Sequence, residues 1–112
     1  MEINTRKVGD VHVLDINGKI VLGDATKAIR HTINDLLVNG GQKIVLNLID
    51  VKYIDSSGIG ELVRTYTTVT NEGRQLRLLN LTKKVRELLV ITKLLTVFQV
   101  YENEQAAVAS FA

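Results

Sequence analysis

The segment KIVLNLIDVKYIDSSGIGELV, residues 43–63, decides the fold of this chain. Residues 43–48 are a short run of mostly branched apolar side chains, which is the pattern of a buried strand. From Ile59 onward, apolar residues recur at helical spacing, and Asn71-Glu72-Gly73 ends that pattern. An aspartate, two serines and a glycine lie between the two parts. The segment therefore predicts a strand that leads through a polar junction into a helix.

Strand and helix patterns also alternate on both sides of this segment. The first two strand patterns flank Gly9-Asp10 and predict an antiparallel hairpin. Asn39-Gly40-Gly41 is typical of a helix end, and Thr82 is a candidate helix cap. The predicted strands cover residues 2–7, 11–17, 43–48, 75–81 and 96–101, and the predicted helices cover 24–38, 59–70, a stretch after Thr82 and 104–111.

This order predicts an α/β domain. We expect one domain over residues 1–112, with a mixed and mostly parallel sheet of about five strands, an N-terminal antiparallel hairpin, and about four helices. In such sheets, ligand chemistry gathers at the loops that leave the carboxyl ends of the strands. The polar junction is one of these loops.

Composition narrows the function classes. The chain has 112 residues, of which 46% are hydrophobic and 23% charged, so it can bury a core without metal or disulfides. The sequence contains no cysteine, which removes thiol chemistry. We find no apolar run of bilayer length and no signal-peptide pattern at the N-terminus, so we expect a soluble cytoplasmic protein.

Cations gather in the C-terminal half of the chain, although the net charge is only +2. No run of Lys and Arg exceeds two residues, and Trp is absent, so nucleic-acid binding lacks its usual supports. We therefore expect solvated faces of helices and strands at these positions. The residues concerned are Arg64, Arg74, Arg77, Lys83, Lys84, Arg86 and Lys93.

Three interpretations of the junction remain open on its residues alone. Asp55 or Ser56 can cap the helix, with Gly58 leaving the first-turn N–H groups accessible. Ser56 or Ser57 can be an enzyme nucleophile, although the only candidate bases, His12 and His31, lie in other patterns. Alternatively, a serine accepts phosphate, because the positive end of a helix favours an anion.

The DSSGIG junction, the strand before it and the segment LRLLNLTKKVRELLVITKL after it resemble the STAS domain of bacterial anti-anti-sigma factors. The resemblance covers almost the whole chain. It implies a partner-switching regulator with no cofactor and no enzymatic activity of its own. The unphosphorylated form binds an anti-sigma factor, usually a serine kinase, and so frees a sigma factor; a PP2C-type phosphatase reverses the modification.

In this family the serine directly after the aspartate is the phosphoacceptor, which corresponds to Ser56. Many members read G-E-[LI]-D after the second strand, whereas this chain has Lys19 and Val21 at the two acidic positions. We expect Asp24 either to substitute for a missing acid or to cap the first helix. The switch loop and partner interface implied by the resemblance comprise Tyr53, Asp55, Ser57, Gly58, Ile59, Asp24 and Arg64.

Two further expectations concern assembly and exposure. A partner-switching protein should be a monomer or weak homodimer, whereas the alternative, a STAS scaffold of a stress-sensing complex, should form a large particle. A third alternative is a regulatory module of a membrane transporter. We expect Tyr66 and Tyr101 at the edge of the core, and Tyr53 exposed beside the junction.

Overall fold

The computed structural model describes residues 1–111 and contains a five-stranded sheet in the order β1-β2-β3-β4-β5. Strands β1 and β2 are antiparallel, and each later neighbour is parallel to the one before it. The strands are β1 (Glu2–Val8), β2 (Val11–Ile20), β3 (Lys43–Ile54), β4 (Gln75–Leu79) and β5 (Val100–Tyr101). The helices are α1 (Asp24–Val38), α2 (Ser56–Asn71), α3 (Lys83–Ile91) and α4 (Glu104–Ala109). The predicted fold class is confirmed.

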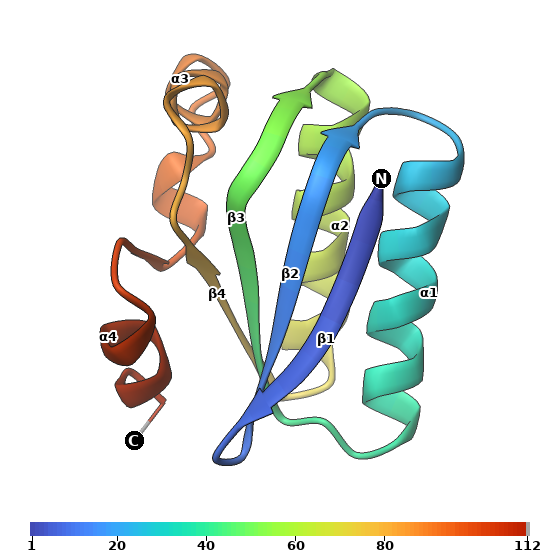
Figure 1. Cartoon of the computed structure of the whole chain (residues 1–112), viewed down its shortest axis with the longest axis vertical. Coiled ribbons are helices and arrows are strands. Elements are labelled where there is room, and N and C mark those ends of the chain that lie inside the picture. The colour runs from blue at the N-terminus through green and yellow to red at the C-terminus, as the bar shows by residue number, and fades with distance from the viewer. Residues whose placement is uncertain (112) are drawn as a thin grey trace.

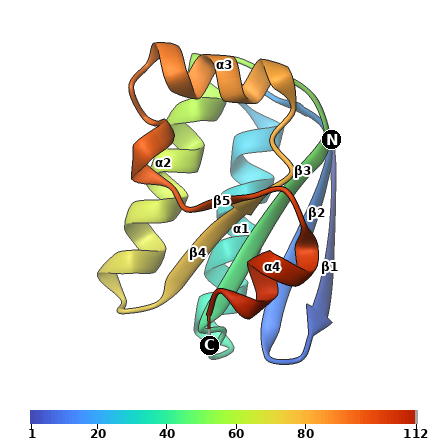
Figure 2. The ribbon, with the colours of Figure 1, turned by 90° about the vertical axis from the view of Figure 1, so that its left-hand side faces the viewer.

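The helices divide between the two faces of the sheet, as Figure 1 and Figure 2 show. Helices α1 and α2 cover one face, which we call the inner face, and α3 crosses the end of the sheet above them. Helix α4 lies on the opposite, outer face. This arrangement follows from side-chain alternation along the strands: Leu46 points into the inner core, whereas its neighbour Val45 packs under α4.

The inner core is much larger than the outer one. It joins buried side chains from β2, β3, β4, α1, α2 and α3, among them Leu14, Ile29, Leu46, Leu62 and Leu89. The outer cluster joins these buried residues of the described chain: Val11, Val13, Val45, Leu79, Ala107 and Phe111. The inner face therefore carries most of the hydrophobic stabilisation.

Polar contacts supplement the small outer cluster. Arg6 of β1 forms ion pairs with Asp15 of β2, at 2.7 Å, and with Glu104 of α4. Hydrogen bonds from Arg6 lower the pKa of both carboxyls and raise the pKa of the guanidinium. Farther along the face, the guanidinium of Arg77 lies 4.6 Å from the centroid of the Phe111 ring. Charged groups thus hold α4 in place where apolar area is scarce.

The local signals for turns and caps act as the sequence predicts. Gly9 has a φ of 61° in the hairpin turn, a conformation that glycine adopts easily. Thr82 caps α3, since its hydroxyl oxygen accepts a hydrogen bond from the Val85 N–H at 3.3 Å. The first helix has the predicted bounds, from Asp24 to Val38.

The strand that leads to the junction is longer than predicted. We expected it to end at residue 48, but β3 continues to Ile54. From Leu48 onward the buried positions are Leu48, Val51 and Ile54, three residues apart. The strand therefore loses the alternation that sequence analysis relies on. The register between β2 and β3 shifts twice over the same region, and such irregularities insert extra residues into a strand.

The prediction of a last strand over residues 96–101 is mostly wrong. Residues 95–97 form a 3₁₀ turn, and only Val100 and Tyr101 pair with β4. Phe98 is instead buried in the inner core, where its ring meets Tyr66 edge to face at a centroid distance of 5.5 Å. Strand β4 also ends two residues early, because Asn80 has a φ of 57°, outside the extended region.

No helix in the described residues, 1–111, is long and apolar enough to cross a bilayer.

Candidate functional site

The junction between β3 and α2 is a single residue, Asp55. The helix begins at Ser56, not at Ile59 as the apolar spacing predicted, because the cap and first turn are polar. Asp55 Oδ1 accepts a hydrogen bond from the Gly58 N–H at 2.8 Å, and the Asp55 carbonyl accepts one from the Ile59 N–H at 3.0 Å. Of the two predicted caps, Asp55 is therefore the residue that performs the role.

The two serines have different environments in the first turn of α2. Ser56 is exposed, whereas Ser57 is half-buried. The N–H groups of both have no acceptor within the helix, and they carry the positive end of its dipole. A negatively charged group on the Ser56 hydroxyl would be placed at that positive end without disturbing the core.

Gly58 has a steric role that the sequence analysis did not identify. A Cβ at this position would lie 2.2 Å from the Ile20 carbonyl oxygen and 2.6 Å from Ile54 Cγ1. Glycine is thus needed for the first turn of α2 to pack against the ends of β2 and β3. Free access to the N–H groups is not its main contribution, because the Gly58 N–H is already bonded to Asp55.

The remaining predicted interface residues are dispersed. Tyr53 is 43% exposed at the end of β3, as predicted, and Ile59 is buried in the inner core. Asp24 is the first residue of α1 rather than its cap; the cap is Gly23, whose N–H donates to Thr26 Oγ1 at 3.2 Å. Arg64 lies roughly two helical turns beyond Ser56, so it is not part of the junction itself.

Neither histidine is placed beside Ser56. His12 is paired with Ile44, near the start of β3, whereas Ser56 follows the end of that strand. His31 is exposed on α1. The hydrogen-bonded base that a serine nucleophile requires is therefore not supplied by either of the two residues named for it.

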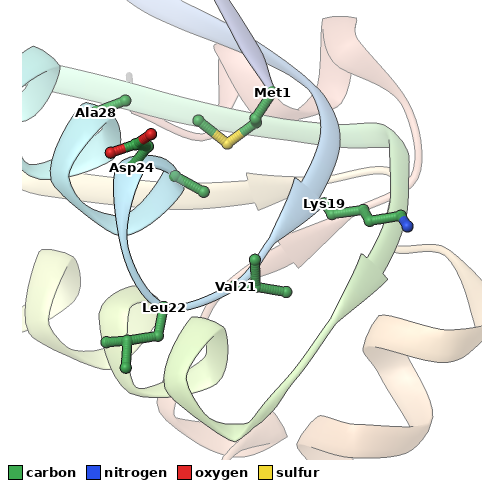
Figure 3. A pocket seen from close by; sticks show the side chains of 7 residues that line it. Met1, Lys19, Val21, Leu22, Asp24 and Ala28 are labelled. Atoms are coloured by element: carbon green, nitrogen blue, oxygen red, sulfur yellow. The ribbon is translucent and has the colours of Figure 1, made fainter.

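The structure adds a pocket that sequence analysis missed, shown in Figure 3. It has a volume of about 480 Å³ and lies between the end of β2 and the start of α1. Leu22, which lines it, is 76% exposed, and the Ile20 carbonyl beside this segment accepts a hydrogen bond from the Asp55 N–H at 3.4 Å. An apolar residue just beyond a strand end was the available signal. The other lining residues are Met1, Lys19, Val21, Asp24, Ala25 and Ala28.

Two of the cations predicted to be solvated are structural. The Arg74 guanidinium donates hydrogen bonds to the carbonyl oxygens of Leu37 and Gly41, at 2.7 and 2.8 Å, and so binds the end of α1. Arg77 is buried against Phe111. Sequence could not reveal this, because a guanidinium in a strand is buried only when its partners come from distant segments. Arg64, Lys83, Lys84 and Lys93 are exposed, and Arg86 is half-buried.

Fold and junction together define a class of small α/β domain that exposes one serine at its shortest strand-to-helix connection. The family model of the STAS domain matches residues 2–107, and the chain belongs to this family. A curated relative from Thermotoga maritima, described as an anti-sigma factor antagonist, is 28% identical over 96 residues, which are 86% of this chain and 85% of the relative.

Solved structures agree with this assignment. The crystal structure of a Thermotoga maritima protein described as an anti-sigma factor antagonist superposes with a TM-score of 0.88 and 26% identity, over 96% of this chain and 92% of that one. The phosphorylated form of the Bacillus cell fate determinant SpoIIAA has a TM-score of 0.77 and 19% identity, over 99% of this chain and 100% of that one. The second likeness concerns the fold alone.

Proposed function

We propose that this protein is an anti-sigma factor antagonist that acts by partner switching. In its unmodified form it binds an anti-sigma factor that is also a serine kinase, and thereby frees a sigma factor. The kinase phosphorylates Ser56, which ends binding, and a PP2C-type phosphatase restores the active form. The protein itself catalyses no reaction and requires no cofactor. The observation that carries the proposal is the exposed Ser56 hydroxyl at the capped start of α2.

Relatives support the regulatory part of this proposal. The Thermotoga maritima protein is described as an anti-sigma factor antagonist, and it matches this chain over most of both lengths. SpoIIAA, which shares the fold, has been solved in a phosphorylated form. Exposure favours Ser56 over the half-buried Ser57 as the acceptor, because a kinase must bring the hydroxyl to its own active site.

Electrostatics explain why phosphorylation ends binding without a change of fold. A phosphoserine carries about −1.5 to −2 charges, and the positive end of a helix accommodates them in the free protein. In a complex, the same group must be desolvated against a surface built for a neutral hydroxyl, which costs several kcal/mol. Because about 1.4 kcal/mol is a factor of ten in affinity, we expect phosphorylation to weaken binding by roughly 100-fold or more.

The test uses Ser56→Ala with Ser57→Ala as its matched control. Copurification with the unmodified protein from the native cell, followed by mass spectrometry, identifies the anti-sigma factor and the modified residue. With that kinase and radiolabelled ATP, we expect Ser57→Ala to be phosphorylated and Ser56→Ala to remain unlabelled while still binding the kinase. Ser56→Asp should weaken binding only in part, since it adds one charge and a shorter side chain.

Phosphate on Ser56→Ala would refute the assignment of the acceptor and would direct attention to Ser57. Equal affinity of the phosphorylated and unmodified proteins for the anti-sigma factor would refute the switch itself.

A further inference from the structure

Strand β3 leaves an aromatic side chain uncovered beside the junction. Tyr53 is 43% exposed near the carboxyl end of β3, whereas α4 packs over Val45, near the other end of this strand. Figure 2 shows α4 on the outer face of the sheet. A half-exposed tyrosine offers a flat apolar ring and a hydroxyl together, a combination common at protein interfaces. Tyr53 is three residues before Ser56, so a partner at the junction would meet both.

Two lysines from different elements flank this ring. Lys19 of β2 is the cross-strand neighbour of Tyr53, and Lys84 of α3 places its ammonium 5.9 Å from the ring centroid. Figure 3 shows the Lys19 side chain directed away from Met1 and from Asp24, the acidic residue that lines the pocket. We call Lys19, Tyr53 and Lys84 the lysine–tyrosine patch.

Within the described residues, the two lysines of this patch have no carboxylate partner. Among residues 1–111, no carboxylate lies within 4.0 Å of the ammonium group of Lys19 or Lys84. By contrast, Lys43 pairs with Asp10 at 2.8 Å, and Lys83 pairs with Glu87 at 4.0 Å. Asp55, the acid nearest to Tyr53 along the chain, accepts a hydrogen bond from the Gly58 N–H.

We propose that the lysine–tyrosine patch binds an acidic segment of the partner protein, with partner carboxylates on Lys19 and Lys84 and an aliphatic side chain against Tyr53. This inference rests on the proposed function for the existence of a partner at Ser56, and it specifies the chemistry of that partner. Complementary charge of this kind contributes to specificity and to the association rate.

The sign of the proposed switch supports an acidic partner. Phosphate on Ser56 adds negative charge next to the patch, so it repels partner carboxylates and competes with them for the lysines. A basic partner surface would instead be attracted by the phosphate, and modification would strengthen binding. A cationic patch facing carboxylates thus increases the difference in partner affinity between the unmodified and the phosphorylated protein. A protein is favoured over a nucleic acid because the patch has one aromatic ring and no stacking series.

The first experiment is zero-length crosslinking of the complex. A water-soluble carbodiimide joins an amine to a carboxylate only when the two are in contact. With the purified anti-sigma factor identified above, we expect amide links from Lys19 and Lys84 to Asp or Glu of the partner, located by mass spectrometry. Lys7 on β1 and Lys93 beyond the far end of α3 are the internal controls, and they should remain unlinked.

The second experiment measures affinity after charge reversal. Lys19→Glu/Lys84→Glu should weaken binding of the anti-sigma factor by about 100-fold at low salt, and by less as salt rises. Lys7→Glu/Lys93→Glu changes the net charge equally and should stay within about threefold of the wild type. Both lysines of the patch are exposed, and a glutamate in the first turn of α3 is favourable, so circular dichroism should confirm an intact fold.

The outcomes separate this inference from the proposed function. If Lys19→Glu/Lys84→Glu binds with wild-type affinity, or if crosslinks are confined to other lysines, the proposed role of the patch in partner binding is refuted. This holds even when Ser56 phosphorylation still controls binding. A labelled single-stranded RNA that binds the wild type but not the same double variant would show that the patch binds nucleic acid. That result would also refute the proposal of an acidic protein partner. Failure of the kinase to modify Ser56 would instead refute the proposed function.

Discussion

The two faces of the sheet are closed in different ways. The inner face is covered by α1 and α2 over a continuous apolar cluster. On the outer face, α4 is the one covering helix among residues 1–111, and the Arg6 ion pairs help to hold it. The rest of the outer face leaves Tyr53 and Ile49 exposed. The inner face therefore accounts for most of the stability, and the outer face retains free surface next to Ser56 for a partner.

The largest expected effect comes from Gly58, where the first turn of α2 packs against the ends of β2 and β3. We predict that Gly58→Ala lowers the free energy of unfolding by about 4 kcal/mol, above the usual overpacking cost, because the clashing oxygen belongs to the backbone. Urea unfolding followed by circular dichroism measures this. Gly60→Ala, in the same helix with open space at its Cβ, should stabilise by about 0.5–1 kcal/mol. Similar effects of the two substitutions would show that this contact does not limit the packing of α2.

Substitutions of two adjacent residues on β3 compare how much each face of the sheet contributes to the free energy of unfolding. Leu46→Ala opens a cavity in the inner core and should cost about 3 kcal/mol. Val45→Ala removes less apolar volume from the smaller outer cluster and should cost about 2 kcal/mol. Both values come from urea unfolding at constant m-value. An equal or larger loss for Val45→Ala would mean that the outer cluster contributes more than its size indicates.

The smallest effect concerns the ion pairs under α4. Because Arg6 lowers the pKa of Glu104 and Asp15, these carboxylates stabilise the fold above their unfolded pKa values, near 4, and this contribution is lost as pH falls through the lower folded values. We predict that Glu104→Gln costs less than about 1 kcal/mol at pH 7, since both side chains are partly exposed.

The difference between Glu104→Gln and the wild type should be smaller at pH 3 than at pH 7, in urea unfolding measured at both values. Glu87→Gln, in an exposed pair with Lys83, is the control and should change little at either pH. An equal loss from Glu104→Gln at both pH values would show that charge is not what this residue contributes.

Much of the fold was predictable because its signals are local. The Gly9-Asp10 turn, the Thr82 cap and the apolar stripe from Asp24 to Val38 each depend on residues close together in sequence. The failures at the end of β3 and in the last strand share one cause, which is long-range packing. Irregular pairing with β2 extends β3 past residue 48, and Phe98 turns into the core to meet Tyr66, so most of the last strand is lost.

The candidate site divides in the same way. Sequence alone determined the DSSG junction, the cap at Asp55 as one of two candidates, and the exposure of Tyr53. Only the tertiary structure decided that Gly58 is a contact with β2, that Arg74 and Arg77 are structural, and that Lys19 and Lys84 lie beside one ring. The physical reason is that caps and turns depend on neighbouring residues, whereas contacts between β2, β3 and α3 join segments separated by tens of residues.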